Sequence, residues 1–129
     1  IMQALSRILY AEDQVDIQQV AILALETVGG FTVKTCNSGL EATVAIDDFK
    51  PQLLLFDVMM PDMDGPTAFA KIKEMPEHRD IPAIFMTAKV QSNEVQAYLD
   101  MGAIAVIAKP FDPMTLASEI KDIWQRSQQ

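Results

Sequence analysis

Three carboxylates follow two apolar stretches of the sequence. Glu12 and Asp13 come directly after RILYA, and Asp57 ends the run LLLFD. If these stretches are parallel strands that deliver the acids to one edge of a sheet, the charges raise one another's pKa unless a cation neutralises them. Oxygen ligands without a neighbouring His or Cys favour Mg²⁺, with Mn²⁺ as the alternative, over zinc. The sequence therefore predicts a divalent-metal site.

A hydroxyl and an amine stand at the ends of two further apolar stretches. Thr87 ends AIFMT, and Lys109 follows IAVIA. Beside a bound cation, a carboxylate such as Asp57 can act as a nucleophile towards a phosphoryl group. Lys109 would then place its charge near one phosphate oxygen, and the Thr87 hydroxyl would donate a hydrogen bond to another. These residue types predict phosphoryl transfer onto Asp57.

The elements that must position these side chains alternate regularly along the chain. Apolar runs predict five short strands, at residues 7–11, 31–36, 53–57, 83–87 and 104–108. Apolar residues at helical spacing predict helices at about 16–28, from 38 to 49, from 65 onward, around 94–101 and from 113 to about 126. The stripe around 94–101 is the weakest of the five.

This alternation predicts a single doubly wound α/β domain, a (βα)5 unit spanning residues 1–129 with its core at about 6–127. Right-handed crossovers make the sheet parallel and place helices on both faces. For five units we expect the flavodoxin-like strand order 2-1-3-4-5, with a crevice between the first and third strands. That order brings Glu12, Asp13 and Asp57 together. We expect no output domain.

Composition and charge narrow the classes of partner. Half of the residues are hydrophobic, the net charge is −8, and the ten Lys and Arg form no run. This argues against direct binding to nucleic acid or an anionic membrane. No apolar run could span a bilayer and no secretory signal is evident, so we expect a cytoplasmic protein. Cys36 is predicted to be packed, and His78, in the polar segment EHRD, to be solvated.

Four segments together resemble the receiver domain of two-component response regulators, over nearly the whole chain. They are the acidic pair in ILYAEDQ, the segment FDVMMPDMDG, the Thr and Ala of FMTAK, and AKPF. The resemblance implies that Asp57 is the phosphoacceptor and that Thr87 and Lys109 contact the phosphate. It implies three further Mg²⁺ ligands, which are Asp13 directly, Glu12 through water, and the backbone carbonyl of Met59. It also implies a cis peptide between Lys109 and Pro110.

The resemblance implies partners as well as a site. The phosphoryl donor would be a histidine kinase or a phosphotransfer protein, and the domain would catalyse its own phosphorylation and a slow dephosphorylation. A downstream protein would bind the face formed by the last strand and the last two helices, and a homodimer is a further expectation. Many family members carry Tyr or Phe where this chain has Val106, so transmission through such a ring is in doubt. Met59 and Lys89 occupy positions that look rate-setting.

Two other functions use parts of the same pattern. An Mg²⁺-dependent phosphatase of the aspartyl-phosphate type would share the carboxylate site, but Met59 stands where a second aspartate would be needed as acid and base. A flavodoxin-like cofactor binder would need a Ser/Thr/Gly-rich phosphate loop after the first strand, and none follows it.

Overall fold

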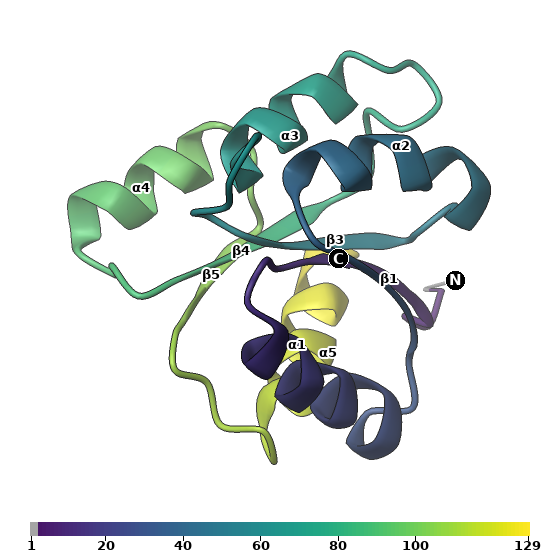
Figure 1. Cartoon of the computed structure of the whole chain (residues 1–129), viewed down its shortest axis with the longest axis vertical. Coiled ribbons are helices and arrows are strands. Elements are labelled where there is room, and N and C mark those ends of the chain that lie inside the picture. The colour runs from purple at the N-terminus through teal and green to yellow at the C-terminus, as the bar shows by residue number, and fades with distance from the viewer. Residues whose placement is uncertain (1–2) are drawn as a thin grey trace.

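A five-stranded parallel sheet forms the centre of the computed structural model, which describes residues 3–129 (Figure 1). Its strands are β1 (Arg7–Ala11), β2 (Thr32–Cys36), β3 (Leu53–Asp57), β4 (Ala83–Thr87) and β5 (Ala105–Ala108). They lie in the order β2-β1-β3-β4-β5, and all four pairings are parallel. The predicted flavodoxin-like topology is confirmed.

Helices cover both faces of this sheet (Figure 1). One layer holds α2 (Gly39–Phe49), α3 (Gly65–Lys73) and α4 (Ser92–Asp100), and the other holds α1 (Val15–Ile22), its continuation η1 (Leu23–Val28), and α5 (Leu116–Ser127). Each layer buries its own apolar cluster against the sheet. Among the described residues, no helix is both long and apolar enough to cross a membrane.

The strands that carry the site are the most buried parts of the chain. Every residue of β3 and of β4 is buried, as expected for central strands of a parallel sheet covered on both faces. The edge strand β2 instead alternates between exposed and covered residues until it ends at the buried Cys36. Burial raises the pKa of the Cys36 thiol to about 11, which agrees with its predicted role as a packed residue.

The helices lie close to the predicted ranges, and the last helix departs most from its predicted start. The first helix ends at Val28, as predicted, in a wider turn in which the Gly29 N–H reaches back five residues to the Ala24 carbonyl at 3.1 Å. The last helix begins at Leu116 rather than at residue 113. There the Asp112 carboxylate accepts the Met114 N–H at 2.8 Å, and this local turn occupies the residues just before the helix.

Short polar caps fix the loops at the carboxyl edge of the sheet. The Ser38 hydroxyl accepts the Glu41 N–H at 3.1 Å at the start of α2. The Asp64 carboxylate accepts the Thr67 N–H at 2.8 Å at the start of α3, followed by Gly65 and a proline in the first turn. These caps hold the segments that follow β2 and β3, which border the predicted site.

Candidate functional site

The three predicted carboxylates converge at the carboxyl edge of the sheet. Strands β1 and β3 pair with Ala11 opposite Phe56, so the acids that follow them arrive at neighbouring positions. Glu12, Asp13 and Asp57 each contribute one carboxylate oxygen to a group whose members lie within 4.8 Å of one another. Glu12 is 1% exposed and Asp57 4% exposed, whereas Asp13 is half-buried. The expected acidic cluster is therefore present in the fold.

Lys109 reaches into this cluster from the end of β5. Its Nζ lies 2.6 Å from Asp57 Oδ1 and 3.1 Å from Glu12 Oε1. The Lys109 N–H donates to the Thr87 carbonyl at 2.9 Å, which fixes the start of the side chain beside β4. The peptide bond from Lys109 to Pro110 is cis, as the resemblance implies. One ammonium thus serves two buried carboxylates.

The acidic cluster carries more negative than positive charge. Burial raises the pKa of Asp57, and the charge of Asp13 adds to this effect against the opposing influence of Lys109. Burial likewise raises the pKa of Glu12, with the charge of Asp57 acting in the same direction. Burial by itself would lower the pKa of Lys109, but the two adjoining carboxylates outweigh it and the pKa is raised.

The donor set fits a hard divalent cation. Three carboxylates face a single ammonium, and no His or Cys belongs to the group. Because two of the acids are almost fully buried, their repulsion is poorly screened by water, and a cation would relieve it. Glu12, Asp13 and Asp57 could hold Mg²⁺ or Mn²⁺ through oxygen alone, leaving positions for water and phosphate oxygens.

Thr87 lies at the end of the neighbouring strand. Asp57 pairs with Met86 across β3 and β4, so Thr87 stands one position beyond the partner of Asp57. Its side chain is buried, and Oγ1 accepts the Lys89 N–H at 3.1 Å. The hydroxyl proton remains free to donate to a ligand oxygen. Thr87 and Lys109 therefore flank Asp57 from the same side of the sheet.

The loop after β3 is folded tightly against Asp57. The Val58 N–H donates to the Met86 carbonyl at 3.0 Å, and the Gly65 N–H donates to the Val58 carbonyl at 3.0 Å. The backbone of Met59 acts to lower the pKa of Asp57 against the effect of burial, and the Met59 side chain is 71% exposed. The loop thus presents its backbone to the acid and the Met59 side chain to solvent.

Gly65 makes this close approach possible. A Cβ at this position would lie 2.2 Å from the Asp57 carbonyl oxygen, so backbone would have to move. We expect Gly65→Ala to lower the free energy of unfolding by about 1–3 kcal/mol in urea titrations and to slow the phosphoryl transfer that the sequence predicts. Gly30→Ala is the control for the transfer rate. Its φ of 76° strains an alanine, but nothing lies within 4 Å of its Cβ and it precedes β2, at the edge of the sheet away from Asp57, so the rate should stay native. Unchanged phosphorylation in Gly65→Ala would contradict this interpretation.

One contributor to the site was not predicted from the sequence. Gln18 is buried in α1, and its side-chain amide donates to the Glu12 carbonyl and, at 2.7 Å, to Asn37 Oδ1. This links the acidic turn to the segment after β2. A glutamine in an amphipathic helix usually points to solvent. The one signal in the sequence was that Gln18 lies only six residues after Glu12.

The prediction for His78 was wrong. The residue was expected to be solvated, but it is buried, with Nε2 2.8 Å from Asp47 Oδ1. Its polar neighbours in sequence remain on the surface, while its ring packs beneath them. It lies in the segment before β4, whereas Asp57 lies at the end of β3, so the two belong to opposite edges of the parallel sheet.

Comparisons with known proteins agree on one family. The family described as the response regulator receiver domain matches residues 8–121. The transcriptional regulatory protein CpxR homolog of Haemophilus influenzae is 32% identical over 95% of this chain and 52% of its own length. The probable transcriptional regulator ycf27 of Porphyra purpurea is 31% identical over 94% of this chain and 48% of its own length. The chain thus spans about half the length of these curated relatives.

Solved structures give the same result. A putative response regulator from Chloroflexus aurantiacus superposes with a TM-score of 0.84 at 28% identity, covering 96% of this chain and all of that one. The signal receiver domain of a signal transduction histidine kinase from Syntrophus aciditrophicus has a TM-score of 0.80 at 30% identity, covering 96% of this chain and 93% of that one. The likeness extends over nearly the whole fold.

Proposed function

This chain belongs to the response regulator receiver domain family of two-component systems, and from that premise we propose that Asp57 accepts a phosphoryl group from a histidine kinase or phosphotransfer protein. The observation that carries the proposal is the convergence of Glu12, Asp13 and Asp57 around the Lys109 amine, 2.6 Å from Asp57. A buried carboxylate at a strand end, beside a cation site and an ammonium, is equipped to receive phosphate.

The metal would be held by four groups of this chain. Asp13 and Asp57 would bind it directly, Glu12 would bind it through water, and the Met59 backbone carbonyl would supply a further oxygen. Mg²⁺, or Mn²⁺ in its place, neutralises charge that the ammonium leaves uncompensated. The raised pKa of Asp57 and of Glu12 supports this assignment, because burial and mutual repulsion disfavour the charged acids without a cation.

Each remaining side chain has one task in the transfer. Asp57 attacks phosphorus through a carboxylate oxygen, the bond from phosphorus to the donor's imidazole nitrogen breaks, and that nitrogen keeps the electron pair. The Lys109 ammonium contacts both Asp57 and Glu12 before the transfer. It would then also donate a hydrogen bond to a phosphate oxygen. The buried Thr87 hydroxyl donates to another oxygen. The product is an aspartyl phosphate on the chain itself.

The consequence of phosphorylation is a change in binding. Phosphate can shift a conformational equilibrium only through contacts that differ between two states, and Thr87 and Lys109 are the groups placed to make them. We assign the downstream partner, or a second copy of the chain, to the α4–β5–α5 face. Val106 is half-buried in β5, so the signal must pass without an aromatic ring at that position. We place this single receiver domain, residues 1–129, in the cytoplasm, without direct contact to nucleic acid or membrane.

A stoichiometry experiment separates a receiver from a phosphatase. The protein is incubated with acetyl phosphate and Mg²⁺, and with a generic phosphomonoester, while released phosphate is followed over time. A receiver should take up about one equivalent from acetyl phosphate, release it slowly, and leave the phosphomonoester almost untouched. Rapid multiple turnover of the phosphomonoester would support the phosphatase instead, although Met59 occupies the place of its acid and base.

Two exposed positions should set the lifetime of the aspartyl phosphate. The Met59 and Lys89 side chains lie two residues beyond Asp57 and Thr87, and both are exposed. Attack by water must approach past them, so Met59→Asn and Lys89→Ala are each expected to change the first-order rate of dephosphorylation severalfold. Radiolabelled phosphate remaining after donor removal gives that rate. The control is Met114→Ala, since Met114 is equally exposed and lies outside the site. Identical rates in all four proteins would end this idea.

A further inference from the structure

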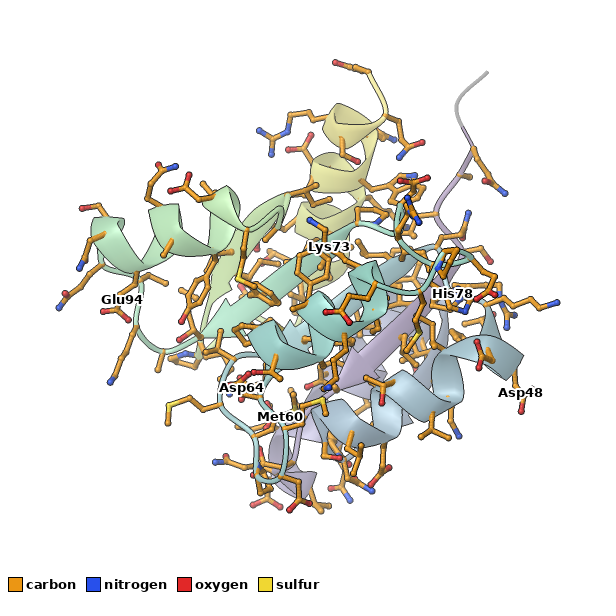
Figure 2. The ribbon with its side chains drawn as sticks, turned by 90° about the horizontal axis from the view of Figure 1, so that it is seen from above. Asp48, Met60, Asp64, Lys73, His78 and Glu94 are labelled. Carbon is orange, nitrogen blue, oxygen red and sulfur yellow. The ribbon has the colours of Figure 1, made fainter. Side chains whose placement is uncertain are left out.

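We propose that His78, Asp47 and Glu77 form a second metal site, for a divalent transition metal of the zinc class, at the edge of the sheet opposite Asp57. Asp47 lies in the last turn of α2, and the other two residues lie in the segment between α3 and β4. Figure 2 shows His78 near the end of α2 that carries Asp48. Met60 and Asp64, beside the start of α3, lie away from it. The site is therefore separate from the acidic cluster.

The three ligand atoms already lie close together. His78 Nε2 is 2.8 Å from Asp47 Oδ1 and 4.0 Å from Glu77 Oε2, and one ligand atom from each residue falls within 4.8 Å of the others. Two ligands on one tetrahedral zinc stand roughly 3.3–3.6 Å apart, given bonds of about 2.0–2.2 Å. Both carboxylate side chains are mostly exposed, at 72% and 75%. They can make the small adjustments needed without disturbing the core.

The imidazole is the fixed member of the group. The His78 side chain is only 10% exposed. The backbone N–H of His78 donates to the Met75 carbonyl at 3.0 Å, and the backbone carbonyl of His78 accepts the Ile81 N–H at 3.2 Å. A buried ring on a hydrogen-bonded backbone, presenting one nitrogen to two exposed carboxylates, is pre-organised for a ligand. Asp47 lies within hydrogen-bond distance of this nitrogen, whereas Glu77 Oε2, at 4.0 Å, lies beyond it and remains free to bind a cation.

The charge balance also favours a cation at this place. Within residues 3–129, neither Asp47 nor Glu77 forms an ion pair with a lysine or arginine. Two carboxylates therefore converge on an imidazole with no fixed positive partner. The nitrogen donor distinguishes this site from the oxygen-only cluster around Asp57, because imidazole suits zinc, copper and nickel whereas carboxylates alone suit Mg²⁺. The two sites should select different ions from a mixture.

The single histidine of the chain makes the proposal directly observable. With one His in the sequence, the imidazole proton signals in an NMR spectrum of the untagged protein belong to His78 without assignment. Zn²⁺ is titrated in the presence of saturating Mg²⁺, which occupies the acidic cluster. We expect the His78 signals to shift and to reach a plateau at one equivalent of Zn²⁺. Signals that do not move under a severalfold excess of Zn²⁺ would overturn the proposal.

Matched variants test the two carboxylates. Asp47→Asn and Glu77→Gln should each weaken Zn²⁺ binding by at least about tenfold, as loss of metal-site residues generally does. Asp48→Asn removes the same charge from the adjacent residue of α2 and should bind Zn²⁺ like the native protein. Asp13→Asn should also keep the His78 shift, because it alters only the acidic cluster. Equal affinity in Asp47→Asn and Asp48→Asn, or loss of the shift in Asp13→Asn, would refute the assignment.

Discussion

The Asp57→Ala protein is expected to gain no phosphoryl group from acetyl phosphate and Mg²⁺, whereas the native protein gains one. Asp57 is the only member of the acidic cluster delivered by the fully buried β3, and the only one whose carboxylate the Lys109 amine approaches to 2.6 Å. Removing it deletes the nucleophile, and no neighbouring group can restore a carboxylate at that point. The expected effect is complete loss, read by intact mass under non-reducing, near-neutral conditions that preserve the acyl phosphate.

Two further proteins make this result specific. Asp62→Asn removes a carboxylate from the same loop at an exposed position with a φ of 68°, which asparagine tolerates, so it should be phosphorylated normally. Asp57→Asn keeps the size of the side chain and should also remain unmodified. Thermal unfolding checks that both Asp57 variants are folded. A phosphoryl group found on the Asp57→Ala chain, at any residue, would refute the assignment of the acceptor.

Mg²⁺ is expected to stabilise the native protein and to lose that effect in Asp13→Asn. A ligand that binds only the folded state, at a free concentration of 100 times its Kd, stabilises by about 2.7 kcal/mol. For a domain of this size, that corresponds to a rise in the thermal midpoint on the order of 10 °C. Asp13 is the half-exposed acid of the cluster, so it is placed to bind the ion without lying in the core.

The metal-free comparison adds a second readout. Because the acids repel one another, Asp13→Asn should be at least as stable as the native protein when Mg²⁺ is removed by a chelator. Chelation should therefore lower the midpoint of the native protein towards that of the variant and leave the variant unchanged. Asp16→Asn is the control, since it removes an exposed acid from the first turn of α1 and should retain the Mg²⁺ shift. An equal Mg²⁺ shift in Asp13→Asn would contradict the ligand assignment.

The sheet could be predicted because its central strands are short, mostly apolar runs. The residues of β1, β3 and β4 coincide with the predicted ranges, since LLLFD and AIFMT leave no alternative to burial on both faces. Helix ends were harder to predict. The start of α5 depends on the Asp112 side chain, which hydrophobic periodicity does not reveal, whereas the first helix ends at Val28 as predicted.

The site was predictable to the extent that it depends on strand ends. Parallel strands must present their final residues at one edge, and this is enough to bring Glu12 and Asp57 together. The contact of Lys109 with both of these acids could not be predicted from the sequence, because a flexible four-carbon side chain can reach many points. His78 was misjudged for a related reason. Polar neighbours in sequence suggest exposure, whereas the depth of one ring in a loop depends on how the loop closes over α2.

The strand order has a consequence for how the chain is made. The first strand in the sequence is not at the edge of the sheet, since β1 pairs with both β2 and β3. During synthesis, a nascent chain that has emerged only as far as β2 can pair β1 on one edge. The backbone groups on the other edge of β1 have no strand to pair with until β3, which ends at residue 57, has left the ribosome. We expect stable folding to wait for that point, and a truncated chain ending before it to be prone to aggregation.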